Sequence, residues 1–246
     1  MNSFPILILT KRRSGSTTVA TFLSRVTPGE AIAHEPFNAD RKFGKDLVEL
    51  SRSGDSVTLG KEVRRIMKSR PSLKHCFDNL PTILTKEVIR AAVHNDYKIV
   101  VLTRRDTVAR LLSLAIAKST GAWGSKAAAE IYPEIIAGKR QPAQINLDQI
   151  KKLYFDEFYR TGLVLSQLKH SSVQLKWILA EDLFHDKKST KQKARDLAAW
   201  FGCEVAPEDP SLELFSSDRD QRSADMGPYI PNYSEAKALL ENFCDF

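Results

Sequence analysis

Two short runs of this sequence are almost entirely apolar and rich in β-branched residues. They are residues 4–10, FPILILT, and residues 97–103, YKIVVLT. Strands buried on both faces have this near-continuous apolarity, whereas strands with one wet face alternate apolar and polar residues. Doubly buried strands belong to parallel sheets that helices cover on both sides. The two runs therefore predict an α/β fold with a central parallel sheet.

Further short apolar runs alternate with helical patterns along the rest of the chain, which is typical of a three-layer α/β sandwich. With no linker and no internal repeat, we expect one domain, residues 1–246. Ser189 is expected to cap a helix that Gly202 ends, and residues 207–233 are expected to form a long loop. The other strands are expected at 31–34, 73–77 and 173–180, and the helices at 18–26, 40–53, 61–69, 82–94, 107–118, 147–169, 190–201 and 234–243.

The charge balance is basic, with 37 Lys and Arg against 30 Asp and Glu and a net charge of +7. Such an excess favours anionic partners such as nucleotides or sulfated groups, although a modestly basic surface gives the same count. Three cysteines without a CxxC pair or a Cys/His cluster predict no disulfide framework and no structural zinc, which fits a reducing compartment. No apolar run approaches the length of a membrane span, so we expect a cytoplasmic protein.

The first apolar run leads into a small polar loop, residues 11–18, KRRSGSTT, before a helical pattern. An anion over the start of that helix would meet free backbone N–H groups and the positive end of the helix dipole. Gly15 lets the backbone approach closely, Arg13 can bind two oxygens, and four hydroxyl groups are at hand: Ser14, Ser16, Thr17 and Thr18. The loop therefore contains the kinds of group that an anion-binding site needs.

This loop is not a Walker A motif, which needs two glycines and a Lys-Ser/Thr pair at the helix start. The alternative interpretation is a serine-capped helix whose basic neighbours face solvent. Lys11 and Arg12 are expected to add a positive field or to face solvent.

The second apolar run has the same design. Its strand ends at Thr103, Arg105 follows, and Ser113 lies eight residues later in a helical pattern. Ligands of open parallel sheets bind beyond the carboxyl ends of the strands, so Arg13 and Arg105 would suit a ligand with two anionic groups. The alternative is that Arg104, Arg105 and Arg110 merely decorate an exposed helix start.

Together the two segments resemble the sulfotransferase family over residues 4–120. RSGST resembles the family's 5′-phosphosulfate loop, and Arg105 with Ser113 resembles its 3′-phosphate motif. The resemblance implies 3′-phosphoadenosine 5′-phosphosulfate (PAPS) as sulfuryl donor, 3′-phosphoadenosine 5′-phosphate (PAP) as product, and no metal. It implies that Arg13 also stabilises the leaving phosphate, and that the 5′ group is bound by Arg13, Ser14, Gly15, Ser16, Thr17 and Thr18.

A third match is HEPFN, residues 34–38, which resembles the bacterial trehalose and carbohydrate-type enzymes of this family. In that type a glutamate at this place is the base, which implies Glu35; His34 is the alternative base. The apolar surroundings of Glu35 are expected to raise its pKa towards the working pH. LKHCFDNLP, residues 73–81, resembles that group's lysine-containing strand, so Lys74 is a candidate contact to donor or acceptor.

Later segments match the family less well. Arg219 and Arg222 stand where many sulfotransferases carry a basic loop over the 3′-phosphate, but QRSAD replaces the usual Arg-Lys-Gly. Residues 181–183, EDL, are interpreted as a structural turn. Residues 40–72 and 122–146 are expected to shape the acceptor pocket.

The sequence therefore predicts a sulfotransferase that moves a sulfuryl group by in-line displacement to the hydroxyl of a small molecule or carbohydrate. It predicts no nucleic-acid partner, and it gives no indication of oligomeric state. Two alternatives stay open: a P-loop-type nucleotide kinase, and a non-catalytic module that binds polyanions or nucleic acid. The kinase alternative requires a Walker A lysine, and the polyanion module requires a continuous basic face with interleaved aromatic residues.

Overall fold

The computed structural model describes residues 4–169, 171–184, 187–215 and 223–244. These residues form two compact units. The first holds the described residues of 1–103 and 159–216, and the second holds those of 104–158 and 217–246. Each unit is described by itself, and one domain over residues 1–246 stays a prediction.

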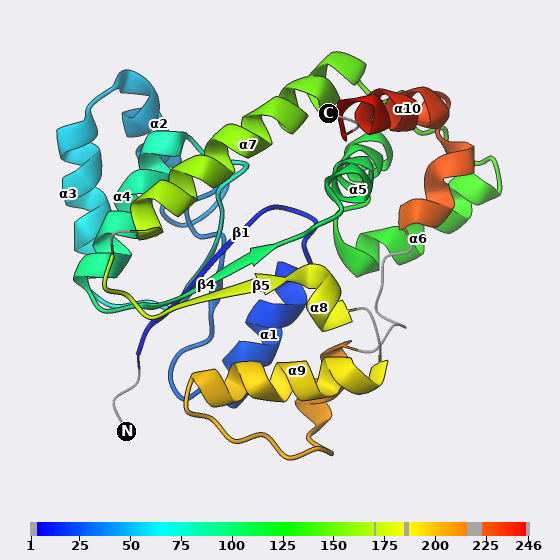
Figure 1. The fold of residues 1–246 in the computed structure, drawn as a ribbon. Coiled ribbons are helices and arrows are strands. Elements are labelled where there is room, and N and C mark those ends of the chain that lie inside the picture. Colours follow the sequence, from blue (N-terminus) through cyan, green and yellow to red (C-terminus); the bar gives the residue numbers. More distant parts are fainter. Residues whose placement is uncertain (1–3, 170, 185–186, 216–222, 245–246) are drawn as a thin grey trace. The chain divides into compact units, whose positions relative to one another are not determined.

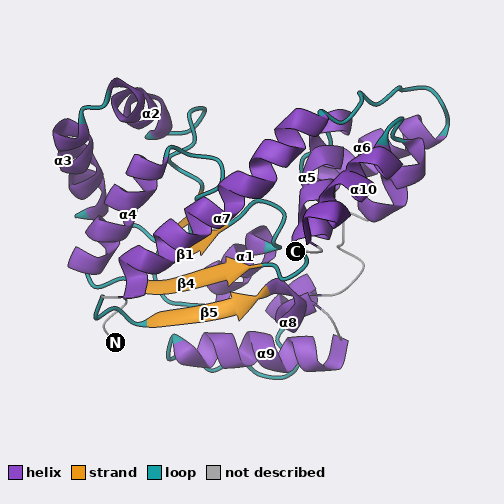
Figure 2. Cartoon of the chain, turned by 45° about the horizontal axis from the view of Figure 1, so that its top comes forward, coloured by secondary structure: helices purple, strands orange, loops and turns teal. Residues whose placement is uncertain are grey.

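The first unit is built on a five-stranded parallel sheet with the order β2-β3-β1-β4-β5. Strand β1 lies in the middle, with Leu7 level with Leu73 on one side and with Ile99 on the other. All five predicted strands are present, and Figure 2 shows β4 and β5 side by side. Their bounds are β1 Ile6–Thr10, β2 Ala33–His34, β3 Leu73–Cys76, β4 Lys98–Thr103 and β5 Leu175–Leu179.

Helices cover both faces of this sheet, as the doubly apolar strands predict. Leu9 and Val101 point into one core, and Ile8 and Val100, one residue away, point into the other. The first core is covered by α2 (Gly44–Ser53), α3 (Ser56–Met67), α4 (Thr82–His94) and the C-terminal part of α7 (Leu147–Lys169). The second is covered by α1 (Ser16–Val26), α8 (Ala180–Phe184), α9 (Lys187–Trp200) and the 3-10 helix η1 (Pro210–Phe215) (Figure 1).

The connections after β1 and β3 leave the sheet towards opposite faces. The chain passes from β1 into α1 on one face, whereas it passes from β3 into α4 on the other. Because β1 and β3 are neighbours, their connections diverge at the carboxyl edge of the sheet. In open α/β sheets such a switch point is where ligands bind.

The second unit is helical and has a core of its own. Leu111 and Ile116 of α5 pack there with Tyr132 of α6, Ile150 of α7 and Leu240 of α10. The bounds are α5 Thr107–Thr120, α6 Gly124–Ile136, η3 Ser223–Tyr229 and α10 Tyr233–Cys244, together with the first part of α7.

Several predictions about elements were wrong. Helix α6 lies inside residues 122–146, where we expected no helix; it contains Pro133, a residue that normally interrupts helices. The 207–233 segment, expected as a loop, contains η1 and η3. Helix α9 begins before Ser189, so this serine lies inside the helix and not at its cap. Among the described residues no helix is long and apolar enough to cross a membrane.

Candidate functional site

The loop between β1 and α1 has an unusual backbone. Arg13 has a φ of 68° and Gly15 a φ of 75°, so the chain turns through the left-handed region twice before the helix begins. Gly15 occupies the N-cap position, and its carbonyl accepts a hydrogen bond from the N–H of Thr18 at 3.1 Å. The first N–H groups of a helix lack acceptors within the helix itself. The loop therefore leads directly into the first turn of α1, which begins at Ser16, two residues before the predicted start.

The side chains of this loop differ in burial. Ser14 is 1% exposed, and its hydroxyl has no hydrogen-bond partner among the described residues. Ser16 is also buried, whereas Gly15 and Thr17 are exposed. A buried hydroxyl without a partner is costly, and an anion held at the start of α1 would supply an acceptor for it.

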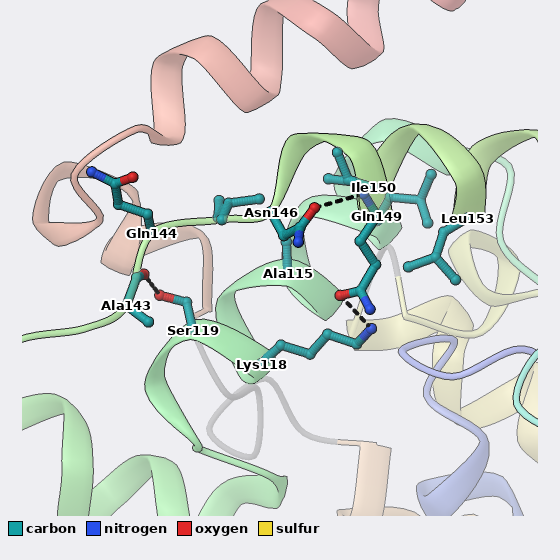
Figure 3. Close-up of a pocket in the computed structure, with 11 residues that line it drawn as sticks. Ala115, Lys118, Ser119, Ala143, Gln144, Asn146, Gln149, Ile150 and Leu153 are labelled. Carbon is teal, nitrogen blue, oxygen red and sulfur yellow. Dashed lines mark hydrogen bonds between the residues drawn. The ribbon is translucent and has the colours of Figure 1, made fainter.

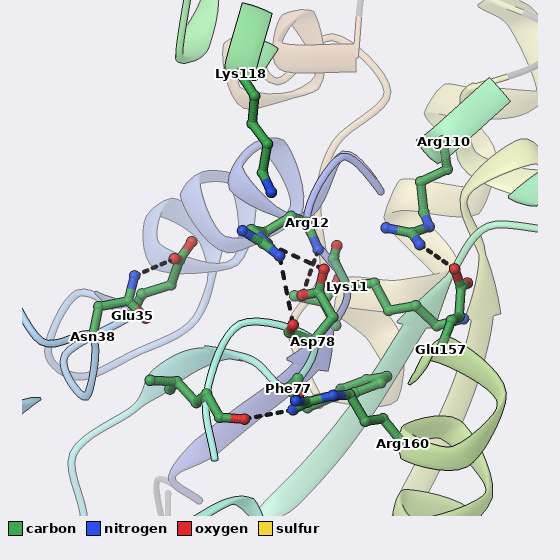
Figure 4. Close-up of polar contacts among 12 residues, drawn as sticks. Lys11, Arg12, Glu35, Asn38, Phe77, Asp78, Arg110, Lys118, Glu157 and Arg160 are labelled. Atoms are coloured by element: carbon green, nitrogen blue, oxygen red, sulfur yellow. Dashed lines mark hydrogen bonds and ion pairs between the residues drawn. The ribbon is translucent and has the colours of Figure 1, made fainter. Parts of the chain in front are cut away.

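Lys11 and Arg12 do not face solvent freely, so the solvent-facing alternative was wrong, whereas their contribution to a positive field stays a prediction. Lys11 is only 5% exposed. The backbone N–H of Arg12 donates to Asp78 Oδ1 at 3.0 Å, and Arg12 Nε donates to Asp78 Oδ2 at 3.1 Å (Figure 4). Asp78 follows β3, so this pair fastens the loop after β1 to the loop after β3. The reason is a contact with a distant part of the chain: a carboxylate in the loop after β3 holds the Arg12 cation.

Lys74 of β3 joins two of the predicted site segments. Its Nζ forms an ion pair with Glu35 Oε1 at 2.7 Å and donates to Thr17 Oγ1 at 3.2 Å. The Lys74 side chain is 4% exposed and that of Glu35 is 21% exposed. A nearly buried ammonium therefore stands between the start of α1 and the candidate base.

Glu35 directly follows the short edge strand β2, and its backbone is held in place. Its φ is 51°, and its N–H donates to the carbonyl of Lys74 at 3.0 Å. Asn38 Nδ2 donates to Glu35 Oε2 at 2.7 Å, as Figure 4 shows. Both carboxylate oxygens therefore have a donor, one from β3 and one from the turn that follows Glu35.

The pKa of Glu35 is lowered from its ordinary value, so the expected rise was wrong. Burial alone raises this pKa. The charge of Lys74, with hydrogen bonds from Lys74, Asn38 and Cys76, outweighs the burial. Sequence patterns show the apolar neighbours of Glu35, but they do not show the lysine that reaches it from another strand.

Three further titratable groups lie near Glu35. Loss of solvent and then the Lys74 charge lower the pKa of His34, the alternative base. Burial lowers the pKa of His75 to about 4, and His75 Nε2 lies 2.9 Å from Thr85 Oγ1. Burial raises the pKa of the Cys76 thiol well above its ordinary value. These groups are therefore neutral beside the ionised pair of Lys74 and Glu35.

The Arg105 motif lies in the second unit. Arg105 is exposed in the turn that precedes α5, and Asp106 caps this helix by accepting from the N–H of Ala109 at 2.8 Å. Ser113 is buried, and its Oγ lies 2.8 Å from Ser223 Oγ of η3. Arg219 and Arg222 lie outside the described residues. Ser113 thus contacts η3, which belongs to the 207–233 segment.

Arg110 is not a decoration of an exposed helix start. It is 1% exposed and forms an ion pair with Glu157 of α7 inside the second unit (Figure 4). Its role is structural, because a buried guanidinium requires a carboxylate partner.

A pocket of about 100 Å³ lies in the second unit between α5 and the start of α7. Lys118 donates to Gln149 Oε1 at 3.0 Å at this pocket, as Figure 3 shows. Pockets for drug-sized ligands span several hundred Å³, so this pocket is too small for a nucleotide. None of the predicted catalytic or donor-binding residues lines it, but residues 143–146 do, and they belong to the segment expected to shape the acceptor pocket.

Comparisons with protein-family models, with curated proteins and with solved structures found no match to this chain.

In the first unit the structure brings Thr17 and Glu35 to the same lysine. Sequence reasoning missed two contributors, Asn38 and Asp78. The signal for Asn38 was its position three residues after Glu35 in HEPFN. The signal for Asp78 was weaker, because it was only the presence of a carboxylate directly after the predicted strand 73–77.

Proposed function

We propose that this protein is a sulfotransferase that moves a sulfuryl group from PAPS to an acceptor hydroxyl. The observation that carries the proposal is the contact of Lys74 with both Thr17 and Glu35, because it links an anion loop to a carboxylate base. Sulfuryl transfer needs both parts, since one group must hold the donor while another takes the acceptor proton.

The loop residues fit the 5′ end of such a donor. The unsatisfied hydroxyl of Ser14, the first-turn N–H groups after Gly15 and the cation of Arg13 are all suited to phosphate or sulfate oxygens. Ser16, Thr17 and Thr18 add hydroxyl groups. The positive end of the α1 dipole favours the charge that develops on the leaving phosphate.

In the proposed step, the acceptor oxygen attacks sulfur from the side opposite the bridging oxygen. A sulfur–oxygen bond forms to the acceptor, and the bond to the bridging oxygen breaks. The acceptor proton passes to Glu35, and PAP leaves with the electron pair of the broken bond. Glu35 is suited to this role because it is ionised in the free protein and 21% of its side chain is exposed.

Arg105 and Ser113 are proposed to bind the 3′-phosphate, and Arg222 to assist them. The exposed guanidinium of Arg105 can bind two phosphate oxygens. The acceptor is proposed to be a small molecule or carbohydrate, with no metal ion required because Arg13, Lys74 and backbone N–H groups neutralise the donor. A cytoplasmic location stays a prediction.

Calorimetry with PAP tests the donor half of this proposal. We expect the wild type to bind PAP and Arg13→Ala to bind it at least tenfold more weakly, as for the loss of a charged hydrogen bond. Arg25→Ala is the matched control, because Arg25 is an exposed arginine in the last turn of α1, at the end of the helix remote from the loop. A wild type that does not bind PAP, but binds ATP with Mg²⁺ or a nucleic acid, would replace the proposal with one of the alternatives.

A further inference from the structure

Lys74 offers more donors than its two contacts use. An ammonium group carries three N–H donors. Among the described residues, one donor is directed to Glu35 and one to Thr17. The side chain is almost completely buried, so a third donor has little access to bulk water. An anion bound beside Thr17 would lie within reach of this ammonium.

The same ammonium determines the charge state of Glu35. Burial alone would raise the Glu35 pKa, and the charge of Lys74 is the largest influence that opposes it. An ammonium drawn towards a divalent anion interacts less with Glu35, and the anion's own negative charge also disfavours the ionised form of Glu35. Both effects act in the same direction and favour the protonated carboxyl.

We propose that Lys74 is a cation shared by the anion loop and Glu35, so that an anion bound at the loop takes over Lys74 and makes Glu35 a stronger base. The inference rests on the proposed function in one respect, because it takes the loop as the donor site. It goes further in assigning Lys74 the coupling role. Glu35 is then a weak base in the free protein and gains basicity when the donor is in place.

The other groups around Glu35 do not provide this coupling. Asn38 and the Cys76 thiol donate neutral hydrogen bonds to Glu35, and neither carries a charge that a bound anion could draw away. Among the described residues, His34 and His75 also interact electrostatically with Glu35, and the pKa of each is lowered, so both are neutral near pH 7. Lys74 is the charged group that contacts both Glu35 and the anion loop.

Thermodynamic linkage makes the coupling reciprocal. If anion binding raises the Glu35 pKa, the protein takes up a proton when it binds the anion. The anion then binds more tightly as the pH falls towards the Glu35 pKa. Sulfate is a suitable probe, because it keeps both charges over the mildly acidic and neutral range.

The test is an NMR titration of side-chain carboxyl carbons in glutamate-labelled protein, with and without saturating sulfate. The Glu35 signal is identified as the one that is missing from the spectrum of Glu35→Gln. We expect sulfate to raise the Glu35 pKa by about 1–3 units, the range that an adjacent charge produces. In Lys74→Met we expect a raised Glu35 pKa without sulfate and a smaller further rise with it. Lys74→Arg retains the positive charge and should therefore keep the Glu35 pKa low in the absence of sulfate.

The outcomes separate the coupling from the proposed function. Sulfate that shifts the backbone amides of Gly15 and Ser16 but leaves the Glu35 pKa unchanged overturns the coupling and leaves the donor site intact. A full sulfate-induced rise in Lys74→Met also overturns the role of Lys74. If neither sulfate nor PAP perturbs the loop amides, both the coupling and the donor site are wrong.

Discussion

The ring of Phe184 lies against Gly15 where a side chain would begin. A Cβ at position 15 would stand 2.5 Å from Phe184 Cε2, and the φ of Gly15 is +75°. Phe184 is in turn held by Phe215, with ring centroids 5.7 Å apart, and Phe215 packs edge-on against Phe22 of α1 at 5.2 Å. An aromatic row therefore supports the loop from one side, and only glycine satisfies both constraints at this position.

Gly15→Ala is expected to destabilise the protein by about 1–3 kcal/mol, the usual cost of a non-glycine residue in the left-handed region. It should also abolish PAP binding, because the start of α1 shifts. Urea unfolding and calorimetry measure the two effects. Adding Phe184→Ala removes the clash but not the backbone strain, so stability should recover in part only. A fully stable Gly15→Ala would show that the loop tolerates a side chain.

The Arg12–Asp78 pair is expected to fix the anion loop to the loop after β3. A double-mutant cycle with Arg12→Ala and Asp78→Ala should give a coupling free energy of about 1–2 kcal/mol, because the side-chain ion pair is hydrogen-bonded and largely buried. Denaturant unfolding of the four proteins measures it. Arg41 and Asp40 form a matched exposed pair, for which we expect no measurable coupling. Equal coupling in both pairs would contradict the structural role of Asp78.

His75 is expected to make the protein sensitive to mild acid. Its pKa is about 4 in the folded protein against an ordinary 6.5, so the unfolded chain takes up the proton first. The contribution of neutral His75 to the free energy of unfolding is fully present above about pH 6.5. It declines as the pH falls to about 4, by about 3 kcal/mol in total. Unfolding free energies measured across this range should depend less on pH in His75→Gln. An unchanged slope in the variant would exclude His75 as the source.

Glu35 also makes the stability of the folded protein depend on pH, but at a lower pH than His75 and through its negatively charged form. Because its pKa is lowered, ionised Glu35 stabilises the folded state above about pH 4.5, which is the ordinary pKa of a glutamate. This contribution to stability is lost as the pH falls through the pKa of Glu35 in the folded protein. Glu35→Gln should remove this acid dependence and lower the free energy of unfolding by about 1–3 kcal/mol near pH 7, because Lys74 loses a charged partner. Once an acceptor is known, the same variant should lose turnover but retain PAP binding. Full turnover would transfer the base role away from Glu35.

The fold of the first unit could largely be predicted from the sequence, because strands such as β1 and β4 carry continuous apolar runs that only a covered parallel sheet can bury. Helix α4 was predicted with its observed bounds, Thr82–His94, since Pro81 precedes it and its apolar residues are regularly spaced. Helix α6 escaped prediction because Gly124 and Pro133 are typical of loops. Its helical state depends on packing of Tyr132 and Ile135 in the core of the second unit.

The candidate site was predictable only as separate pieces. RSGST and HEPFN carry local signals, but the link between them is Lys74, which lies 57 residues from Thr17 in the chain. The charge state of Glu35 depends on this long-range contact, and that is why local apolarity gave the wrong direction for its pKa. The same holds for Arg12, whose partner Asp78 follows a different strand.

The most direct test of the central claim is a calorimetric comparison of PAP with adenosine 5′-monophosphate, which lacks the 3′-phosphate. We expect the wild type to bind PAP at least tenfold more tightly than the monophosphate, and Arg105→Ala to lose most of that preference, because Arg105 is proposed to make the charged contact with the 3′ group alone. Equal affinities of the wild type for the two nucleotides, or no binding of PAP, would contradict the account.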